Sequence, residues 1–146
     1  MESKNDNDAR CDYNDPESVV RAFIAAMNQW ERDAWQAMRA VCDSDEPASY
    51  QAETLRKLHA VFAAYCTSRK RPYGRQGSFQ NPPEYDPQNE TVQSSSVEKS
   101  RASVDTIRNA ILAGGRHRYI LHRQAGQWRI DNVKHEHDGN WEISIL

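Results

Sequence analysis

Apolar side chains in the first third of the chain recur every three or four residues, the spacing of one face of an α-helix. Between residues 16 and 42 they are Val20, Phe23, Ile24, Met27, Trp30, Ala34, Met38 and Val41. The helix is predicted to start at the sequence Asp15-Pro16-Glu17. Asp15 can cap the free amides of the first turn, Pro16 has a φ that suits the first helical position, and the negative charge of Glu17 is favourable at the positive end of the helix. A continuous helix would be about 40 Å long. We therefore expect a bend or break near residues 31–33, so that the segment wraps the core.

A second helical pattern runs from about residue 50 to 68, after a turn over residues 43–49. Its apolar face consists of Leu55, Leu58, Phe62 and Tyr65. Three cations at positions 69–71 suit the negative end of a helix, and Pro72 cannot continue it. We expect these cations to stabilise the helix end.

From residue 91 the apolar positions alternate, which indicates strands. Five candidates cover residues 91–100, 101–110, 116–124, 127–136 and 140–146. The joins between them are short, and short joins favour antiparallel neighbours. The chain therefore predicts an α+β fold, with N-terminal helices packed on the concave face of a curved antiparallel sheet. We expect one domain over residues 15–146 and a mobile tail over residues 1–14.

Residues 72–90 contain four of the six prolines and predict no regular element. Three aromatic residues lie in this segment, which has little means of burying them all. Acidic residues flank Tyr85 within it, and others gather in the turn over residues 43–49. Exposed aromatic and charged side chains are typical of binding surfaces, and acidic loops would attract a basic partner. The predicted partner-binding residues are Asp43, Asp45, Glu46, Tyr73, Phe79, Glu84, Tyr85 and Asp86. The alternative is a loop that packs its own aromatic residues against the sheet.

Composition narrows the class of protein. The 146 residues carry a net charge of −2, with acidic residues in excess before residue 50 and basic residues in excess after it. Neither part is basic enough to predict nucleic-acid binding. No apolar run is long enough to cross a membrane, and no secretory signal is recognisable. Three widely spaced cysteines suggest neither a disulfide framework nor a zinc site, so we expect a cytoplasmic protein without a cofactor.

The stretch KHEHDGNW, residues 134–141, allows two interpretations. In a strand, His135 and His137 would point to the same face and could share a metal ion, which needs a third ligand. Alternatively, Asp138 and Gly139 form the tight turn of a hairpin. We favour the hairpin, and we predict no metal site.

The sequence also contains candidates for a general base, because a histidine beside a carboxylate can take up protons near neutral pH. The candidates are His117, His122 and Asp131. Pairing about the turn at residues 125–126 brings His122 opposite Arg129, and alternation turns Asp131 to solvent if Trp128 faces the core. We therefore predict no catalytic residue, although a register shift would reverse this argument.

The order helix, helix, proline-rich loop and meander resembles the nuclear-transport-factor-2-like cone fold, above all in YILHRQAGQWRIDNV. The closing WRIDNVKHEHDGNWEISIL and the earlier NPPEYDP resemble the immunity proteins of bacterial polymorphic toxin systems within that superfamily. This resemblance implies a protein that binds and neutralises a cognate toxin, expected to be the C-terminal domain of a large secreted effector, and does no chemistry.

Two other functions stay open at this level. A small cone-fold enzyme, of the isomerase or hydrolase type, would need an open apolar cavity lined by an acid/base pair. An oligomerising scaffold would use the outer face of the sheet, with Tyr119, Leu121, Ile143 and Ile145 if they point outward. We expect a monomer or a homodimer.

Overall fold

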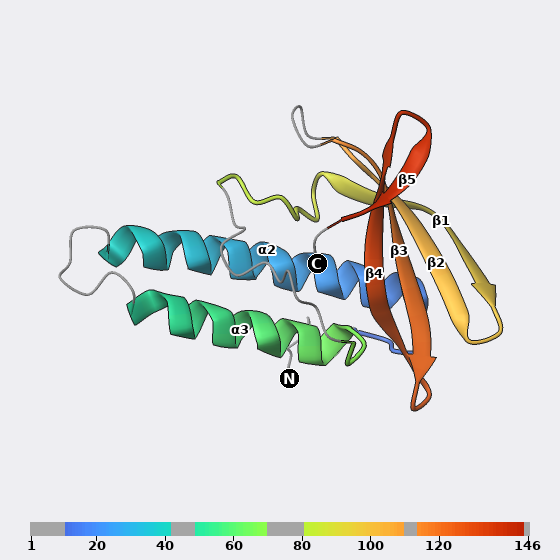
Figure 1. Ribbon diagram of the computed structural model, residues 1–146, viewed down its shortest axis with the longest axis horizontal. Coiled ribbons are helices and arrows are strands. Elements are labelled where there is room, and N and C mark those ends of the chain that lie inside the picture. Colours follow the sequence, from blue (N-terminus) through green and yellow to red (C-terminus); the bar gives the residue numbers. More distant parts are fainter. Residues whose placement is uncertain (1–10, 42–48, 70–80, 110–113, 145–146) are drawn as a thin grey trace, which may run out of the picture.

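In the computed structural model, residues 11–41, 49–69, 81–109 and 114–144 are described here. Two helices, α2 (Pro16–Val41) and α3 (Ser49–Tyr65), lie side by side and antiparallel on one face of a curved five-stranded sheet (Figure 1). The sheet is an antiparallel meander in the order β1-β2-β3-β4-β5. This is the α+β arrangement that the sequence predicts.

The helix α2 is a single uninterrupted element of 26 residues, so the expected bend or break near residues 31–33 is wrong. Asp15 caps its start as predicted, because its carboxylate accepts a hydrogen bond from the Glu17 amide at 3.0 Å. No glycine or proline follows Pro16 within the helix to interrupt it. Glu31, at the expected break, is fully buried and accepts hydrogen bonds from a neighbouring loop, so the helix continues through this position.

The helix α3 ends at Tyr65, earlier than the sequence suggests. Cys66 leaves the helix to form a parallel bridge with Ile130, and the Thr67 amide donates to the Ile130 carbonyl at 2.9 Å. Arg69 pairs with Asp131 at 2.9 Å, while Lys70 and Arg71 lie outside the described residues. The terminal carbonyls of Ala63 and Cys66 accept hydrogen bonds from Arg129 instead. A cation does stabilise this helix end, but it comes from the sheet.

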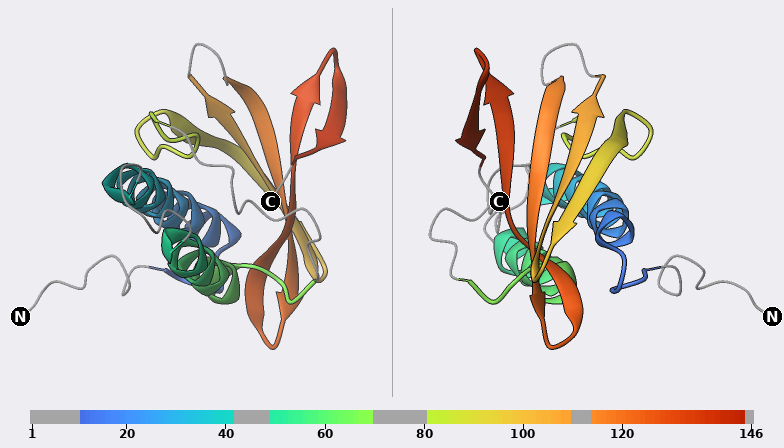
Figure 2. Two further views of the ribbon diagram at one scale, coloured as in Figure 1. Left: turned by 60° about the vertical axis from the view of Figure 1, so that its left-hand side comes forward. Right: turned by 90° about the vertical axis from the view of Figure 1, so that its right-hand side faces the viewer.

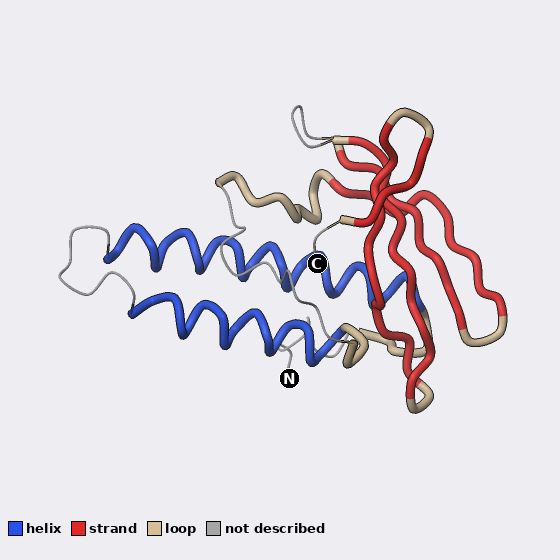
Figure 3. The backbone as a smooth tube through the Cα atoms, viewed as in Figure 1, coloured by secondary structure: helices blue, strands red, loops and turns tan. Residues whose placement is uncertain are grey.

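The strands are β1 (Glu90–Glu98), β2 (Arg101–Arg108), β3 (Gly115–Gln124), β4 (Gln127–His137) and β5 (Asn140–Ile143). Figure 3 shows the tight turns that join β1 to β2, β3 to β4 and β4 to β5. In the turn between β3 and β4, Ala125 and Gly126 have φ values of 51° and 79°. In the turn between β4 and β5, Asp138 and Gly139 have φ values of 52° and 80°. Positive φ at both central residues matches the right-handed twist of the flanking strands.

The core lies between α2 and the concave face of the sheet. Phe23 and Met27 from the helix meet Tyr119, Trp128 and Ile130 from the strands, and each of these side chains is at most 1% exposed. Trp128 and Ile130 therefore both face the core. Since Tyr119 and Leu121 are also fully buried, they cannot form the outer surface of the proposed scaffold. Ile143 is exposed, and Ile145 lies outside the described residues.

The segment before α2 is also packed. The Tyr13 ring stacks on Tyr65 with a centroid separation of 6.4 Å, and its hydroxyl donates to the Ala64 carbonyl. The packed domain therefore begins before Asp15. Residues 1–10 lie outside the described residues, and the mobile tail stays a prediction there. Neither described helix is long and apolar enough to cross a membrane.

We expect Glu31→Gln to lower the free energy of unfolding by about 1–3 kcal/mol, because a buried carboxylate that accepts two amide protons would be replaced by a group with one acceptor oxygen. Urea unfolding followed by circular dichroism measures this. Glu53→Gln, on the exposed face of α3, is the matched control and should unfold like the wild type. An unchanged midpoint for Glu31→Gln would contradict the role assigned to this carboxylate.

Candidate functional site

The described part of the proline-rich loop, residues 81–89, lies against α2 and leads into β1 (Figure 3). Glu31 of α2 accepts hydrogen bonds from the backbone amides of Glu84 and Tyr85, at 3.1 and 3.0 Å. The Asn28 side chain donates to the Tyr85 carbonyl at 2.7 Å. Two side chains of α2 therefore hold this loop by its backbone.

Three predicted partner-binding residues fall in this loop. The expectation that Tyr85 is an exposed aromatic is wrong: it is 1% exposed and packs edge-to-face on Phe23, at 5.6 Å between centroids. Glu84 is tied to Arg108 at 2.9 Å, and Asp86 accepts hydrogen bonds from residues 88 and 89 while staying at the surface. The alternative interpretation, a loop that packs its own aromatic residue, is correct for Tyr85. The remaining candidates, Asp43, Asp45, Glu46, Tyr73 and Phe79, lie outside the described residues.

A buried ion pair lies beneath this loop, at the concave face of the sheet. Glu90 at the start of β1 receives the Arg108 guanidinium at 2.8 Å, and both side chains are almost completely buried. The other Glu90 oxygen accepts the hydroxyls of Thr106 at 2.6 Å and Tyr119 at 2.7 Å. The Arg108 guanidinium also lies over the Tyr85 ring, 4.8 Å from its centroid. We call these residues, with Glu84, the Glu90–Arg108 network.

The Arg108 guanidinium and the Tyr119 hydroxyl of this network are each held in one protonation state. Burial acts to lower the pKa of Arg108, but Tyr119, Glu90, Tyr85 and Glu84 outweigh it and hold the pKa above its ordinary value. Burial, together with the Glu90 charge, raises the pKa of Tyr119 well above its ordinary value. Neither group can exchange protons near neutral pH, which makes both unsuitable as a general acid or base.

His117 lies beside this network and is 8% exposed. Burial and the nearby Arg108 charge lower the pKa of His117 to about 4, despite the opposing effect of Glu90. Its ring lies 6.4 Å from that of His135. His117 is therefore a neutral side chain of the interior at physiological pH.

The arrangement of His122 and Asp131 differs from the prediction. His122 does pair with Arg129 in register, but a bulge follows, because Leu121 pairs with Ile130 and Ile120 with Asn132. Asp131 is the extra residue, and its carboxylate lies 3.9 Å from His122 Nδ1. Asp131 is not turned to solvent, since its side chain is 11% exposed and accepts hydrogen bonds from Thr67 and Arg69. Partial burial raises the pKa of Asp131, but these hydrogen bonds and His122 outweigh it and lower the pKa overall.

The stretch KHEHDGNW forms the predicted hairpin, with Asp138 and Gly139 in its turn. His135 Nδ1 is 2.7 Å from the Ser144 hydroxyl, and its Nε2 is 3.6 Å from Glu142. His137 lies 3.5 Å from the same Glu142 carboxylate. Within the described ranges, no group of three His, Cys, Asp or Glu side chains is arranged to hold a metal ion.

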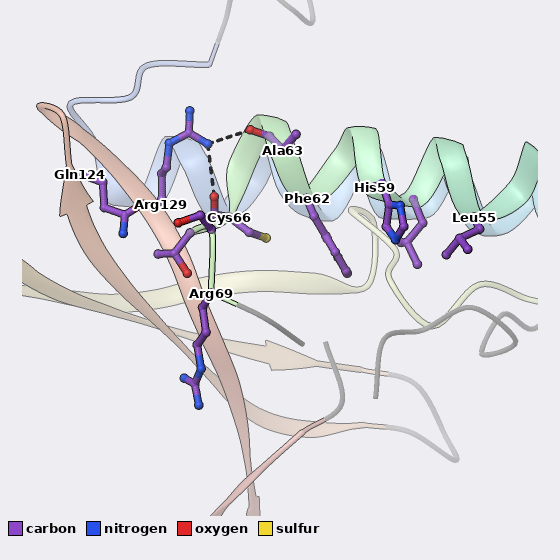
Figure 4. Close-up of a pocket in the computed structure, with 11 residues that line it drawn as sticks. Leu55, His59, Phe62, Ala63, Cys66, Arg69, Gln124 and Arg129 are labelled. Atoms are coloured by element: carbon purple, nitrogen blue, oxygen red, sulfur yellow. Dashed lines mark hydrogen bonds between the residues drawn. The ribbon is translucent and has the colours of Figure 1, made fainter. Parts of the chain in front are cut away.

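A surface cavity of about 570 Å³ opens between α3, the segment that follows it, and the start of β4 (Figure 4). Leu55, Leu58 and Phe62 form its apolar wall, and Arg69 and Arg129 lie at its other end. Arg129 is occupied by the carbonyls of α3, as the dashed lines show. The cavity thus offers apolar area and positive charge, without an acid/base pair pointing into it from the described residues.

The interior network could not be found from residue types alone, although weak signals exist. Glu31 occupies a position in phase with the apolar stripe of α2, four residues after Met27. Arg108 continues the inward alternation of Ala102, Val104 and Thr106. A charged side chain at an inward position is the signal that would have identified both.

Geometry defines the class: a cone-shaped α+β domain whose interior is packed and whose charged interior groups are paired with one another. The family described as NTF2 fold immunity protein matches residues 15–144. Immunity protein RhsIA of Dickeya dadantii (strain 3937) is 32% identical over 117 residues, which are 79% of this chain and 82% of that protein. No solved structure matches the chain. The chain belongs to the family of NTF2-fold immunity proteins, as the sequence resemblance implied.

We expect Arg108→Met to lower the free energy of unfolding by about 3–5 kcal/mol, because Glu90 would stay buried without its counter-charge. The double variant Arg108→Met/Glu90→Gln removes both charges and should recover part of this loss. Urea unfolding of the two single variants and the double variant measures the coupling. Strictly additive losses would contradict a direct interaction between the two side chains.

We expect His117 to make the protein less stable in mild acid. Its pKa is about 4 when folded and about 6.5 when unfolded, so the unfolded state binds more protons between these values. The stabilisation is complete above pH 6.5 and is lost as the pH falls to about 4, by at most about 3 kcal/mol. In His117→Gln the urea midpoint should change less between pH 7 and pH 4.5 than in the wild type. Equal slopes in both proteins would show that His117 does not titrate as described.

Proposed function

We propose that this immunity protein acts by binding a cognate secreted toxin and occluding it, without catalysis of its own. The family assignment supports immunity as the role. The observation that carries the mode of action is the packed interior, in which Phe23, Tyr119 and Trp128 fill the space that an enzyme of this shape would use for substrate. A protein without an open catalytic cavity can neutralise an enzyme by covering its surface.

The charged groups support the same conclusion. Arg108 and Glu90 neutralise each other inside the domain, and His117 is buried and neutral. His122 and Asp131, the pair considered from the sequence, lie 3.9 Å apart, yet Asp131 is engaged by Thr67 and Arg69. The partner is expected to be the C-terminal domain of a large secreted effector, met in the cytoplasm.

Stoichiometry distinguishes this proposal from an enzymatic one. The tagged protein is used to capture its partner from its own cells, and the captured toxin domain is identified by mass spectrometry and purified. Titrating the immunity protein against the toxin's activity should reach complete inhibition at one molecule per toxin. Gel filtration should show the corresponding one-to-one complex.

An enzymatic mechanism would give the opposite result, with complete protection at far less than one molecule per toxin. His122→Ala, which removes the accessible member of the His122–Asp131 pair, should inhibit as well as the wild type. Loss of protection in this variant, with binding intact, would contradict the proposal.

A further inference from the structure

The face of the sheet that points away from the helices carries a compact group of aromatic and charged side chains. No described helix covers this face, which is turned to the viewer in the right panel of Figure 2. The group lies where β3, β4 and β5 pair with one another and with the end of β2. It consists of Asp105, Arg116, Arg118, Lys134, Glu136, Trp141 and Ile143, and we call it the outer-sheet patch.

Strand register places these side chains in two neighbouring rows. In the first row, Asp105 pairs with Arg118, Arg118 with Lys134, and Lys134 with Ile143. In the second row, Glu136 pairs with Trp141 and receives Arg116 at 3.4 Å. Cross-strand partners, and residues two apart along a strand, point to the same face of a sheet, so both rows share one surface.

Trp141 is held by the cations of β3. The Arg118 guanidinium lies 4.3 Å from the centroid of the Trp141 ring, and the Arg116 guanidinium lies 5.3 Å from it. Asp105 fixes Arg118 by two parallel hydrogen bonds of 2.7 and 2.9 Å. Tryptophan and arginine are the residues most enriched where interfaces gain their affinity. Their fixed geometry lowers the entropy lost on binding.

Apolar area adjoins this aromatic centre. Ile143 is 69% exposed, and Val97 on β1 is the other large apolar side chain exposed among the described residues. A lone exposed side chain is ordinary on a protein surface. Ile143 differs because it lies two residues from Trp141 and pairs with Lys134 across the strands. A partner could therefore cover the Trp141 ring and the Ile143 side chain together.

The charge of the outer-sheet patch indicates the chemistry of the partner. Arg118 and Lys134 are direct cross-strand neighbours, an arrangement that destabilises a sheet because the charges repel. Lys134 has no ion pair among the described residues, and the patch has three cations against two carboxylates. A carboxylate placed between Arg118 and Lys134 by a partner would remove this repulsion. A second copy of this chain would instead bring the same positive excess against itself.

We propose that the outer-sheet patch is the surface on which the cognate toxin docks, through an acidic side chain beside an apolar one. This inference rests on the proposed function and deepens it. It assigns the contact to the sheet, whereas the sequence pattern pointed to the acidic loops. The two surfaces demand opposite charges on the toxin, which makes them separable by experiment.

The test uses the purified toxin domain and two variants, Lys134→Glu and Trp141→Ala, with dissociation constants measured by calorimetry at low and high salt. We expect each variant to bind about tenfold more weakly or worse, and Lys134→Glu to lose much of the salt dependence. Lys134→Glu converts the repulsive pair with Arg118 into an attractive one, so it should resist urea at least as well as the wild type. Weaker binding by a protein that is no less stable cannot be attributed to misfolding.

Lys57→Glu is the matched control, because it makes the same charge change on the exposed side of α3. Asp86→Asn tests the rival acidic loop while keeping the oxygen that can accept the hydrogen bond of the Gln88 amide. Wild-type affinity for both patch variants, or a loss confined to Asp86→Asn or Lys57→Glu, would overturn the assignment to the outer-sheet patch.

Three further outcomes separate this inference from the proposed function. If the wild type forms a one-to-one complex that neither patch variant weakens, immunity by binding stands and the docking surface is wrong. If the wild type is a homodimer that Lys134→Glu or Trp141→Ala separates, the patch joins two copies of this chain and the inference is also wrong. Complete inhibition at far less than one molecule per toxin would instead reject the proposed function.

Discussion

The buried ion pair between Glu90 and Arg108 is the interaction on which the concave side of this domain depends. Removing two charges from water costs several kcal/mol for each ion, and the loss is offset only when geometry and further hydrogen bonds are favourable. Both conditions hold, because Glu90 also accepts the hydroxyls of Thr106 and Tyr119. The pair joins β1, β2 and β3 at one point and, through Glu84 and Tyr85, secures the loop that leads into the sheet.

Glu31 extends this constraint to the helical layer. Its buried carboxylate accepts the loop amides of Glu84 and Tyr85, so α2, the loop and the first three strands form one connected unit. A similar connection exists at the other end of the domain, where Arg129 of β4 donates hydrogen bonds to the carbonyls of Ala63 and Cys66, at and just beyond the end of α3. Polar groups that would be costly to bury alone therefore determine how the helices lie on the sheet.

The interior of this cone-shaped domain is filled by its own side chains. Cone-shaped domains can enclose a cavity, but here aromatic side chains and paired charges occupy that space, and the pKa of His117 is lowered so that it stays neutral. The outer face of the sheet offers fixed cations, an aromatic ring and apolar area. Such a surface suits recognition of a protein. Membership in the immunity-protein family and the geometry of this surface therefore both agree with the proposed binding role.

Sequence alone determined the two helices, the five strands, the tight turns and the cone-shaped α+β plan. These follow from short-range patterns: the helical and alternating apolar periods, the cap at Asp15 and the turn residues Ala125-Gly126 and Asp138-Gly139. The resemblance carried by WRIDNVKHEHDGNWEISIL led to the correct family. Only the tertiary structure decided that α2 continues through Glu31, that Tyr85 is buried and that a bulge brings Asp131 beside His122. The burial of Tyr85 and the position of Asp131 depend on contacts between residues far apart in the chain, which a local pattern of apolar and polar residues does not encode. Glu31 lies in phase with the apolar stripe of α2, but the loop amides that bind its carboxylate are equally distant in the chain.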